Sequence, residues 1–257
     1  MRIWMLLLAV TASAGISTTA WSEDTTNFTV SGETPVISII IDDMGSLNKR
    51  GARAIQLPGA IAYSFLPHSP YTIQLAKLAH SYNKEVLLHL PMESIKNHAL
   101  GPGGLSLDMS RDEFVQTLQK DLESVPHVKG INNHMGSLLT RHPGHMMWLM
   151  QAIHEKGELF FVDSRTTSNT VALKVANENH VPSIPRNIFL DHERNIEAIN
   201  REFDRMIEHA RKTGTALAIG HPYKETLTVL EERLPELEDL QIKLVPVSDM
   251  IKLSQKR

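Results

Sequence analysis

Two adjacent carboxylates, Asp42 and Asp43, follow directly after the apolar run Val36–Ile41. Like charges side by side at the end of a buried strand repel each other, so both ionise only where they share a cation or a proton. A cap on the helix expected after Ser46 would account for one carboxylate and leave the other without a role. The pair therefore indicates a metal site or an acid–base centre.

An imidazole follows a second apolar run, Glu85–Leu88, in the segment His89-Leu-Pro-Met-Glu93. Pro91 is expected to end the strand there. His89 can then present a nitrogen, and Glu93 an oxygen, to a divalent cation. A lone His is more often a core residue with satisfied hydrogen bonds, so the metal interpretation depends on the other polar residues that come close to it.

Four further apolar runs also end in polar residues. In chain order these residues are Asn132, Asn133 and His134, then Asp163 and Arg165, then Arg186 and Asp191, and finally His221. Asp163 and Arg165 are spaced to pair, and such an arginine can orient a catalytic carboxylate. His221 is placed to give or take a proton near neutral pH. We expect Asn133, Arg186 and Asp191 to bind substrate.

The elements that position these groups alternate between short apolar runs and segments with helical periodicity. The runs expected as strands are 36–41, 60–65, 85–90, 128–132, 158–162, 181–184, 216–219 and 242–245. Ser110-Arg-Asp-Glu113 is a capping box that starts one of the helices between them. Almost wholly apolar strands are typical of parallel sheets covered on both faces. The alternation predicts one α/β domain, either an open doubly wound sheet or a barrel of seven or eight units.

In such folds the working residues lie just past the carboxyl ends of the strands. The polar residues named above all have that position. Each of them alone is weak support for a site, but their shared placement predicts that they meet at one rim of the domain.

The composition excludes several classes of protein. Of the 257 residues, 42% are hydrophobic, which excludes an intrinsically disordered chain. The net charge of −3, from 26 basic and 29 acidic residues, predicts no nucleic-acid partner. The chain has no Cys and 13 His, so any metal is held by imidazoles and carboxylates.

The first residues have the pattern of a signal peptide. Arg2 precedes the apolar run 3–10, which is shorter than the ~20 residues that a membrane span needs, and small residues follow it. We expect a signal peptide over 1–22, a linker over 23–34 and the folded domain over 35–257, with an uncleaved anchor as the alternative. The mature protein is then periplasmic or secreted, without a stable membrane span, and the lack of Cys suits an oxidising compartment.

The order of these motifs resembles that of the polysaccharide deacetylases, the carbohydrate esterases with a NodB homology domain, and most closely their divergent, YibQ-like branch. The family's Asp-Asp-Gly corresponds to the segment from Asp42 to Gly45, and the segments 132–137, 162–166 and 219–222 resemble the divergent branch. The resemblance extends over about residues 35 to 250 and implies a distorted (β/α) barrel of about seven units.

The resemblance also implies a divalent metal, with zinc as the expected ion. In the family the first Asp acts as the base and the second binds the metal, which assigns these roles to Asp42 and Asp43. The family's His-x-x-x-His supplies two metal nitrogens, but here Glu93 stands at its second position. We expect Asp43, His89 and His134 to bind the metal, because a second imidazole restores the family's ligand set, with Glu93 as a substitute ligand or a neighbour.

The reaction implied is hydrolysis of an N-acetyl or related acyl group. Asp42 takes a proton from a metal-activated water, and His221 protonates the leaving amine. Arg165 is expected to keep Asp42 ionised, and Asp163, which can pair with Arg165, is placed among the catalytic residues. Export places the enzyme beside envelope glycans, so peptidoglycan or a related polysaccharide is the expected substrate.

Two alternatives remain open. A catalytically inactive barrel that keeps its metal and binds envelope glycan or a cell-wall partner is consistent with Glu93 at the position of a family His. A phosphoester hydrolase on a similar barrel is less favoured, because the strand ends lack a basic cluster and a glycine-rich phosphate loop.

Overall fold

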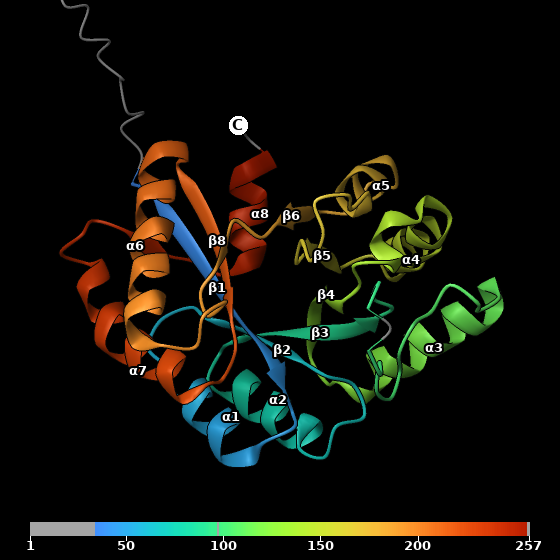
Figure 1. Ribbon diagram of the computed structural model, residues 1–257, viewed down its shortest axis with the longest axis horizontal. Helices are drawn as coiled ribbons and strands as arrows, with labels where there is room; N and C mark the ends of the chain where they lie inside the picture. Colours follow the sequence, from blue (N-terminus) through green and yellow to red (C-terminus); the bar gives the residue numbers. More distant parts are fainter. Residues whose placement is uncertain (1–33, 97, 256–257) are drawn as a thin grey trace, which may run out of the picture. The chain divides into compact units, whose positions relative to one another are not determined.

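Parallel strands alternate with helices along the chain (Figure 1). The computed structural model describes residues 34–96 and 98–255. The strands are β1 (Val36–Met44), β2 (Ala62–Phe65), β3 (Glu85–Met92), β4 (Val128–Met135), β5 (Phe160–Asp163), β6 (Ser183–Pro185), β7 (Ile188–Phe189), β8 (Thr215–Gly220) and β9 (Lys243–Leu244). The helices are α1 (Asn48–Ile55), α2 (Thr72–Ser81), α3 (Arg111–Ser124), α4 (Pro143–Lys156), α5 (Ala172–Glu178), α6 (Ile196–Thr213), α7 (Lys224–Arg233) and α8 (Val247–Gln255). The expected signal peptide, and the linker before Thr34, lie outside the described residues.

The sheet is curled, and a two-residue link joins its two edge strands. Its strand order is β6-β5-β4-β3-β2-β1-β8-β7, all parallel, and β9 pairs with the start of β1. The edge strands β6 and β7 are separated in the chain only by Arg186 and Asn187. The backbone N–H of Arg186 donates to Asp163 of β5 and that of Asn187 to Leu217 of β8, both at 2.9 Å. Of the two expected arrangements, the curled, distorted (β/α) barrel is therefore the one that forms.

Successive side chains of a strand point to opposite faces of the sheet, so the buried hydrophobic residues form two clusters. Ile37, Ile39 and Ile41 of β1 belong to the larger cluster, which includes the buried faces of the surrounding helices. The smaller cluster unites residues of β1, β2, β3, β5, β6 and β8 with Val247, Met250 and Ile251 of α8. Helix α8 thus closes the amino-terminal end of the barrel interior, and its start is held by Glu85, which accepts a hydrogen bond from the Val247 N–H at 2.7 Å.

The inward-facing rows change from apolar to polar toward the carboxyl ends of the strands. Side chains on one face of a strand recur every second residue. The apolar residues that face the interior include Ile40, Ala62, Leu87, Val162 and Ile219. The residues two positions after each of these are, in the same order, Asp42, Ser64, His89, Ser164 and His221. The barrel interior therefore offers a hydrophobic floor and a polar mouth.

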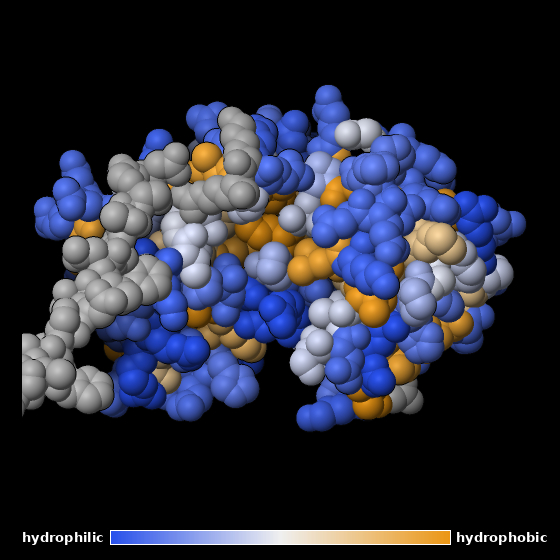
Figure 2. Space-filling model, turned by 90° about the horizontal axis from the view of Figure 1, so that it is seen from above, coloured by the Kyte–Doolittle hydropathy of each residue, from blue (hydrophilic) through white to orange (hydrophobic). Residues whose placement is uncertain are grey.

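Hydrophilic residues cover most of the face seen in Figure 2, with hydrophobic residues visible across its middle. Within the described ranges, no helix has both the length and the hydrophobicity that a bilayer crossing requires. Exposed large hydrophobic residues include Leu47, in the loop between β1 and α1, and Tyr71, just before α2.

A buried carboxyl connects α3 to the loop after β2. Asp121 is 0% exposed, its Oδ1 lies 2.8 Å from His68 Nε2, and its Oδ2 has no hydrogen-bond partner among the described residues. Gly103, at φ +76°, lies against this carboxyl, and any side chain there would collide with it. Burial raises the pKa of Asp121 from 3.8 to about 8. The folded protein therefore keeps this carboxyl protonated at neutral pH.

This raised pKa predicts that stability falls as the pH rises from about 4 to 8. Over that range the Asp121 carboxyl has already lost its proton in the unfolded chain but still holds it in the folded protein. Asp121→Asn retains the neutral form and removes this loss. We expect the variant to be more stable than the wild type by more than about 1 kcal/mol at pH 8 and nearly equal to it at pH 4. Urea unfolding at both pH values measures the difference, with Asp239→Asn at an exposed site as the control. Parallel curves for variant and wild type would contradict the prediction.

Candidate metal centre and active site

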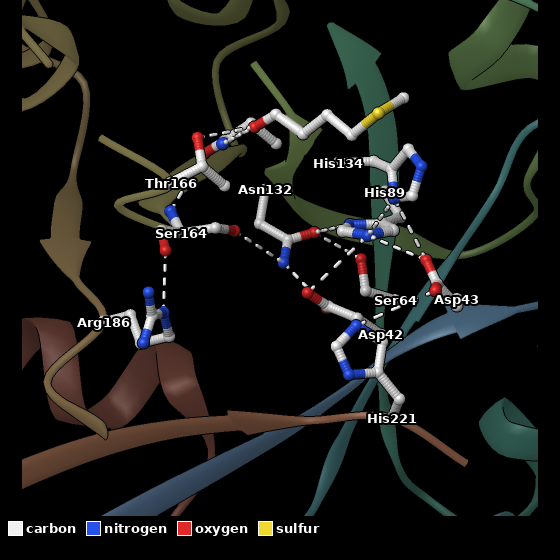
Figure 3. A network of polar contacts seen from close by, with 12 residues as sticks. Asp42, Asp43, Ser64, His89, Asn132, His134, Ser164, Thr166, Arg186 and His221 are labelled. Carbon is white, nitrogen blue, oxygen red and sulfur yellow. Dashed lines mark hydrogen bonds and ion pairs between the residues drawn. The ribbon is translucent and has the colours of Figure 1, made fainter. Parts of the chain in front are cut away.

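Side chains from four strand ends meet in one place (Figure 3). Asp42 and Asp43 come from the end of β1, His89 from β3 and His134 from β4, and His221 follows β8. The structure thus brings together five residues that lie far apart in the sequence, at the rim where parallel strands end.

Asp43, His89 and His134 each direct one potential ligand atom to a common point. His134 Nδ1 lies 3.1 Å from both Asp43 Oδ1 and His89 Nε2, and the last two atoms are 3.3 Å apart. Asp43 Oδ1 is buried, yet it makes no hydrogen bond of good geometry within the described part of the chain. A buried carboxylate oxygen without a hydrogen bond, beside two imidazole nitrogens, fits a divalent cation such as zinc. Three protein ligands also leave a coordination position open, as in catalytic rather than structural zinc sites.

An irregularity in β1 allows two adjacent residues to serve one site. Neighbouring side chains of a regular strand point to opposite faces. The register between β1 and β2 shifts between Ile41 and Met44, and Asp43 has a φ of +56°, in the left-handed region. This local distortion turns Asp43 toward the same space as Asp42. It occurs where Met44 lengthens the family's Asp-Asp-Gly motif.

Asn132 joins Asp42 to the candidate metal ligand His89. Its Nδ2 donates to Asp42 Oδ1 at 2.8 Å, and its Oδ1 lies 2.8 Å from His89 Nδ1 and accepts from Ser64 Oγ at 2.5 Å. A carboxylate only accepts hydrogen bonds, so the amide must direct its NH₂ to Asp42 and its oxygen to His89. With a cation at the site, His89 would therefore carry its proton on Nδ1 and present Nε2 to the cation.

Asn132→Ala is expected to weaken zinc binding by about 10- to 100-fold, because His89 loses the partner that orients its ring. A competition titration with a chromophoric chelator measures the affinity. Asn133→Ala is the matched control, since Asn133 is adjacent and similarly buried, and its side chain hydrogen-bonds to Met135 and Ser164 instead of His89 and Asp42. Equal zinc affinities of the two variants would refute a role for Asn132 in orienting the ligand.

The two adjacent aspartates have different electrostatic environments. Burial raises the pKa of Asp42, although His89 and His221 nearby oppose this effect. Burial would also raise the pKa of Asp43, but its contacts with His134 and His89 outweigh burial and hold that pKa well below its usual value. Two carboxyl groups with pKa values moved apart are suited to different tasks, here a proton acceptor and an anionic ligand.

His221 forms a dyad with Asp191. Its Nδ1 lies 2.9 Å from Asp191 Oδ1, and Asp191 Oδ2 accepts from the His221 backbone N–H at 2.6 Å and from Thr226 Oγ1 at 2.8 Å. The other ring nitrogen, Nε2, is 3.7 Å from Asp43 Oδ2. Burial lowers the pKa of His221, but the hydrogen bond to Asp191 and the charges of Asp191, Asp42 and Asp43 together outweigh burial and raise it. The ring is thus held ready to carry a proton at the edge of the metal centre.

The dyad corrects the expectation that Asp191 binds substrate. The Asp191 side chain is 0% exposed, and its oxygens are occupied by hydrogen bonds with His221 and Thr226. Thr226 of α7, which sequence reasoning missed, holds Asp191 in turn. Its only sequence signal is its place five residues after His221, at the start of the next helix.

Asp163 and Asn133 also differ from expectation, because each lies on the outward row of its strand. Asp163 accepts hydrogen bonds from the backbone N–H of Arg165 at 2.8 Å and from Thr170 Oγ1 at 2.9 Å. Asn133 donates to the carbonyl of Met135 and accepts from the backbone N–H of Ser164. Both side chains therefore shape the loops around the site and do not enter it.

The charge of Arg186 acts on Asp42, and the expected contact between Arg165 and Asp42 is absent from the described residues. Arg165 is exposed, and its guanidinium makes no hydrogen bond or ion pair there. Arg186 donates to the carbonyls of Ser164 at 2.7 Å and Arg165 at 3.2 Å, and its charge interacts with Asp42. The positive charge expected from Arg165 thus comes from Arg186.

Glu93 does not join the metal ligands. Its Oε2 accepts the Leu107 N–H at 2.8 Å, and its backbone pairs with Leu105, Leu138 and Leu139. Glu93 lies four residues, roughly 13 Å along an extended chain, beyond His89, where β3 has ended and the chain turns away. Its carboxylate therefore fixes the loop between β3 and α3, and His134 is the third member of the candidate metal site.

Comparison with known proteins identifies relatives of the whole domain. Residues 39–251 match the model of a family described as divergent polysaccharide deacetylase. The chain is 37% identical over 215 residues to the uncharacterized protein YibQ of Escherichia coli K12, which covers 84% of this chain and 67% of YibQ.

Two solved structures show the same fold. The uncharacterized protein ATU2773 from Agrobacterium tumefaciens C58 has a TM-score of 0.82 at 19% identity, over 90% of this chain and 92% of that one. A mutant of the peptidoglycan deacetylase PdaC from Bacillus subtilis has a TM-score of 0.52 at 11% identity, over 87% and 94%. The family match includes every strand end that supplies a site residue, and the chain is therefore a member of the divergent polysaccharide deacetylase family.

Proposed function

We propose that the protein is an exported, metal-dependent hydrolase that removes N-acetyl or related acyl groups from an envelope glycan such as peptidoglycan. The observation that carries this proposal is the association of a candidate metal triad with two proton-transfer groups. Asp42 Oδ2 lies 3.6 Å from His89 Nε2, and His221 Nε2 lies 3.7 Å from Asp43 Oδ2. Amide hydrolysis needs a base for the attacking water and an acid for the leaving nitrogen.

The chain's own residues divide the reaction between them. A divalent cation held by Asp43, His89 and His134, with zinc the expected ion, would polarise the acyl carbonyl and make water more acidic. Asp42, held through Oδ1 by Asn132, takes the water proton. His221 gives a proton to the leaving amine, while Asp191 holds the ring and stabilises its charged form.

The substrate class and the location rest on two separate arguments. The family description supports a polysaccharide, and PdaC, which shares the fold, is named as a peptidoglycan deacetylase. The signal-peptide pattern of residues 1–22 supports a periplasmic or secreted enzyme, where envelope glycans are within reach.

The geometry supports a hydrolase over a non-catalytic glycan-binding barrel. Glu93, at the position of a family His, is the residue that favoured loss of activity. His134 supplies the missing imidazole, and Asp42 and His221 are both in place beside the triad.

Release of acetate from N-acetylated glycans by the zinc-loaded protein tests the proposal. Peptidoglycan fragments and chitooligosaccharides serve as substrates, and Asp42→Asn as the inactive control. We expect acetate from the wild type alone. A protein that holds zinc and binds glycan but releases no acyl group would be the non-catalytic barrel, and release of phosphate from phosphoesters would favour the phosphoester hydrolase.

A further inference from the structure

A cavity of about 210 Å³ opens beside the candidate metal triad. Asp43 and His134 form part of its wall. The loop between β1 and α1, the end of β2 and the residues after β8 form the rest. A group bound at the triad therefore has this cavity as its immediate neighbour.

Apolar side chains form most of the wall. Met44, Leu47, Leu66 and Pro222 line it, the exposed Ser46 and Arg50 are its polar residues beside the two candidate metal ligands, and the hydroxyl of Tyr223 already accepts a hydrogen bond from Arg194. A sugar ring placed against the apolar side chains would leave hydroxyls without partners, at a cost in free energy. A hydrocarbon chain has no such groups, and its burial against this wall is favourable.

The cavity is also too large for an acetyl group. A water-sized group such as a methyl takes up about 30 Å³, so the methyl of an acetyl group would leave most of the space unfilled. By the same measure, a linear acyl group of about five to seven carbons would occupy the cavity.

The backbone around the cavity is held in place. Leu66 N–H donates to the Met44 carbonyl at 3.0 Å, and Tyr71 N–H donates to the Gly45 carbonyl at 2.9 Å. Gly51 of α1 lies against Leu75 of α2, with 2.5 Å between the position of an added Cβ and Leu75 Cδ1. The close packing of these elements resists a collapse of the cavity and makes it a preformed pocket.

We infer that this cavity is an acyl pocket and that the enzyme prefers linear acyl groups of about five to seven carbons over acetyl. The inference rests on the proposed function, because hydrolysis brings the acyl carbonyl to the triad and so places its chain in the adjoining cavity. Water adds its oxygen to the carbonyl carbon, the C–N bond breaks, and the nitrogen takes a proton. The products are a carboxylate and the free amino sugar.

A series of N-acylglucosamines tests the preference, with acetyl, butanoyl, hexanoyl and dodecanoyl groups and detection of the free amine. Each buried methylene raises binding by up to about fourfold. We expect kcat/KM for hexanoyl to exceed that for acetyl by at least about tenfold and to fall again for dodecanoyl. Leu66→Trp fills the cavity and should reverse the preference. Leu47→Trp, at the exposed rim, serves the same purpose should the first variant not fold, and Leu253→Trp on α8 is the control.

Calorimetry with the carboxylate products separates this inference from the proposed function. Hexanoate should bind the zinc-loaded protein at least about tenfold more tightly than acetate, whether or not any substrate is hydrolysed. Equal kcat/KM for acetyl and hexanoyl substrates would overturn the acyl pocket and leave the hydrolase standing. Absence of all hydrolysis would overturn the proposed function, and hexanoate binding no tighter than acetate would overturn the pocket.

Discussion

His89→Ala is expected to weaken zinc binding by more than about 100-fold. This loss is larger than the loss expected from removing a residue that only orients a ligand. The variant removes one of three ligand atoms from the candidate site, while Asp43 and His134 remain. A two-ligand site holds zinc far less well than a three-ligand site. The metal content of purified protein and a chelator competition titration measure the loss.

His89 is 2% exposed, so its truncation also leaves a void in the polar mouth of the barrel. His134→Ala guards against a folding artefact, because that side chain is 25% exposed and its loss is better tolerated. His154→Ala, on the exposed face of α4, is the matched control and should bind zinc like the wild type. Stoichiometric zinc in both His89→Ala and His134→Ala would eliminate the triad as the metal centre.

Asp42→Asn is expected to lower kcat by about 10²- to 10⁴-fold while zinc stays bound. An amide has nearly the same shape as the carboxyl and can still accept from Asn132, but it cannot take a proton from water. Asp42 is not one of the three ligands, so zinc affinity should change little. Steady-state kinetics with an N-acyl substrate at saturating zinc measure the effect.

Asp239→Asn, at an exposed site, controls for the loss of one negative charge. Zinc content measured on the same Asp42→Asn preparation distinguishes a lost base from a lost metal. A kcat within about tenfold of the wild type would assign proton abstraction to another group, and an empty metal site would assign Asp42 to the ligands.

The rim of the barrel could be predicted from sequence because the strands are parallel. Apolar runs that end in Asp43, His89 and His134 mark the carboxyl ends of β1, β3 and β4, and parallel strands bring those ends to one side of a sheet. The alternation of runs and helical segments likewise predicted the α/β class, although the two-residue strand β7 was too short to produce a signal.

Which of the strand-end residues enter the site was harder to predict, since a shift of one residue reverses the direction of a side chain. Asp163 and Asn133 lie next to inward residues and therefore point outward. Asp43 would also point away if β1 were regular, and only the irregularity between Ile41 and Met44 turns it inward.

The sequence by itself determined the fold class, because periodicity acts locally, and together with the family resemblance it named the candidate ligands of a metal. The tertiary structure alone decided the partnerships across the barrel. Asp191 and His221 are 30 residues apart, and Asn132 reaches Asp42 across 90 residues. Arg186 interacts electrostatically with Asp42 because it lies in the link between the two edge strands β6 and β7 of the curled sheet. Such contacts depend on how strands are ordered and curved around a common interior, and no local pattern of residues encodes that order.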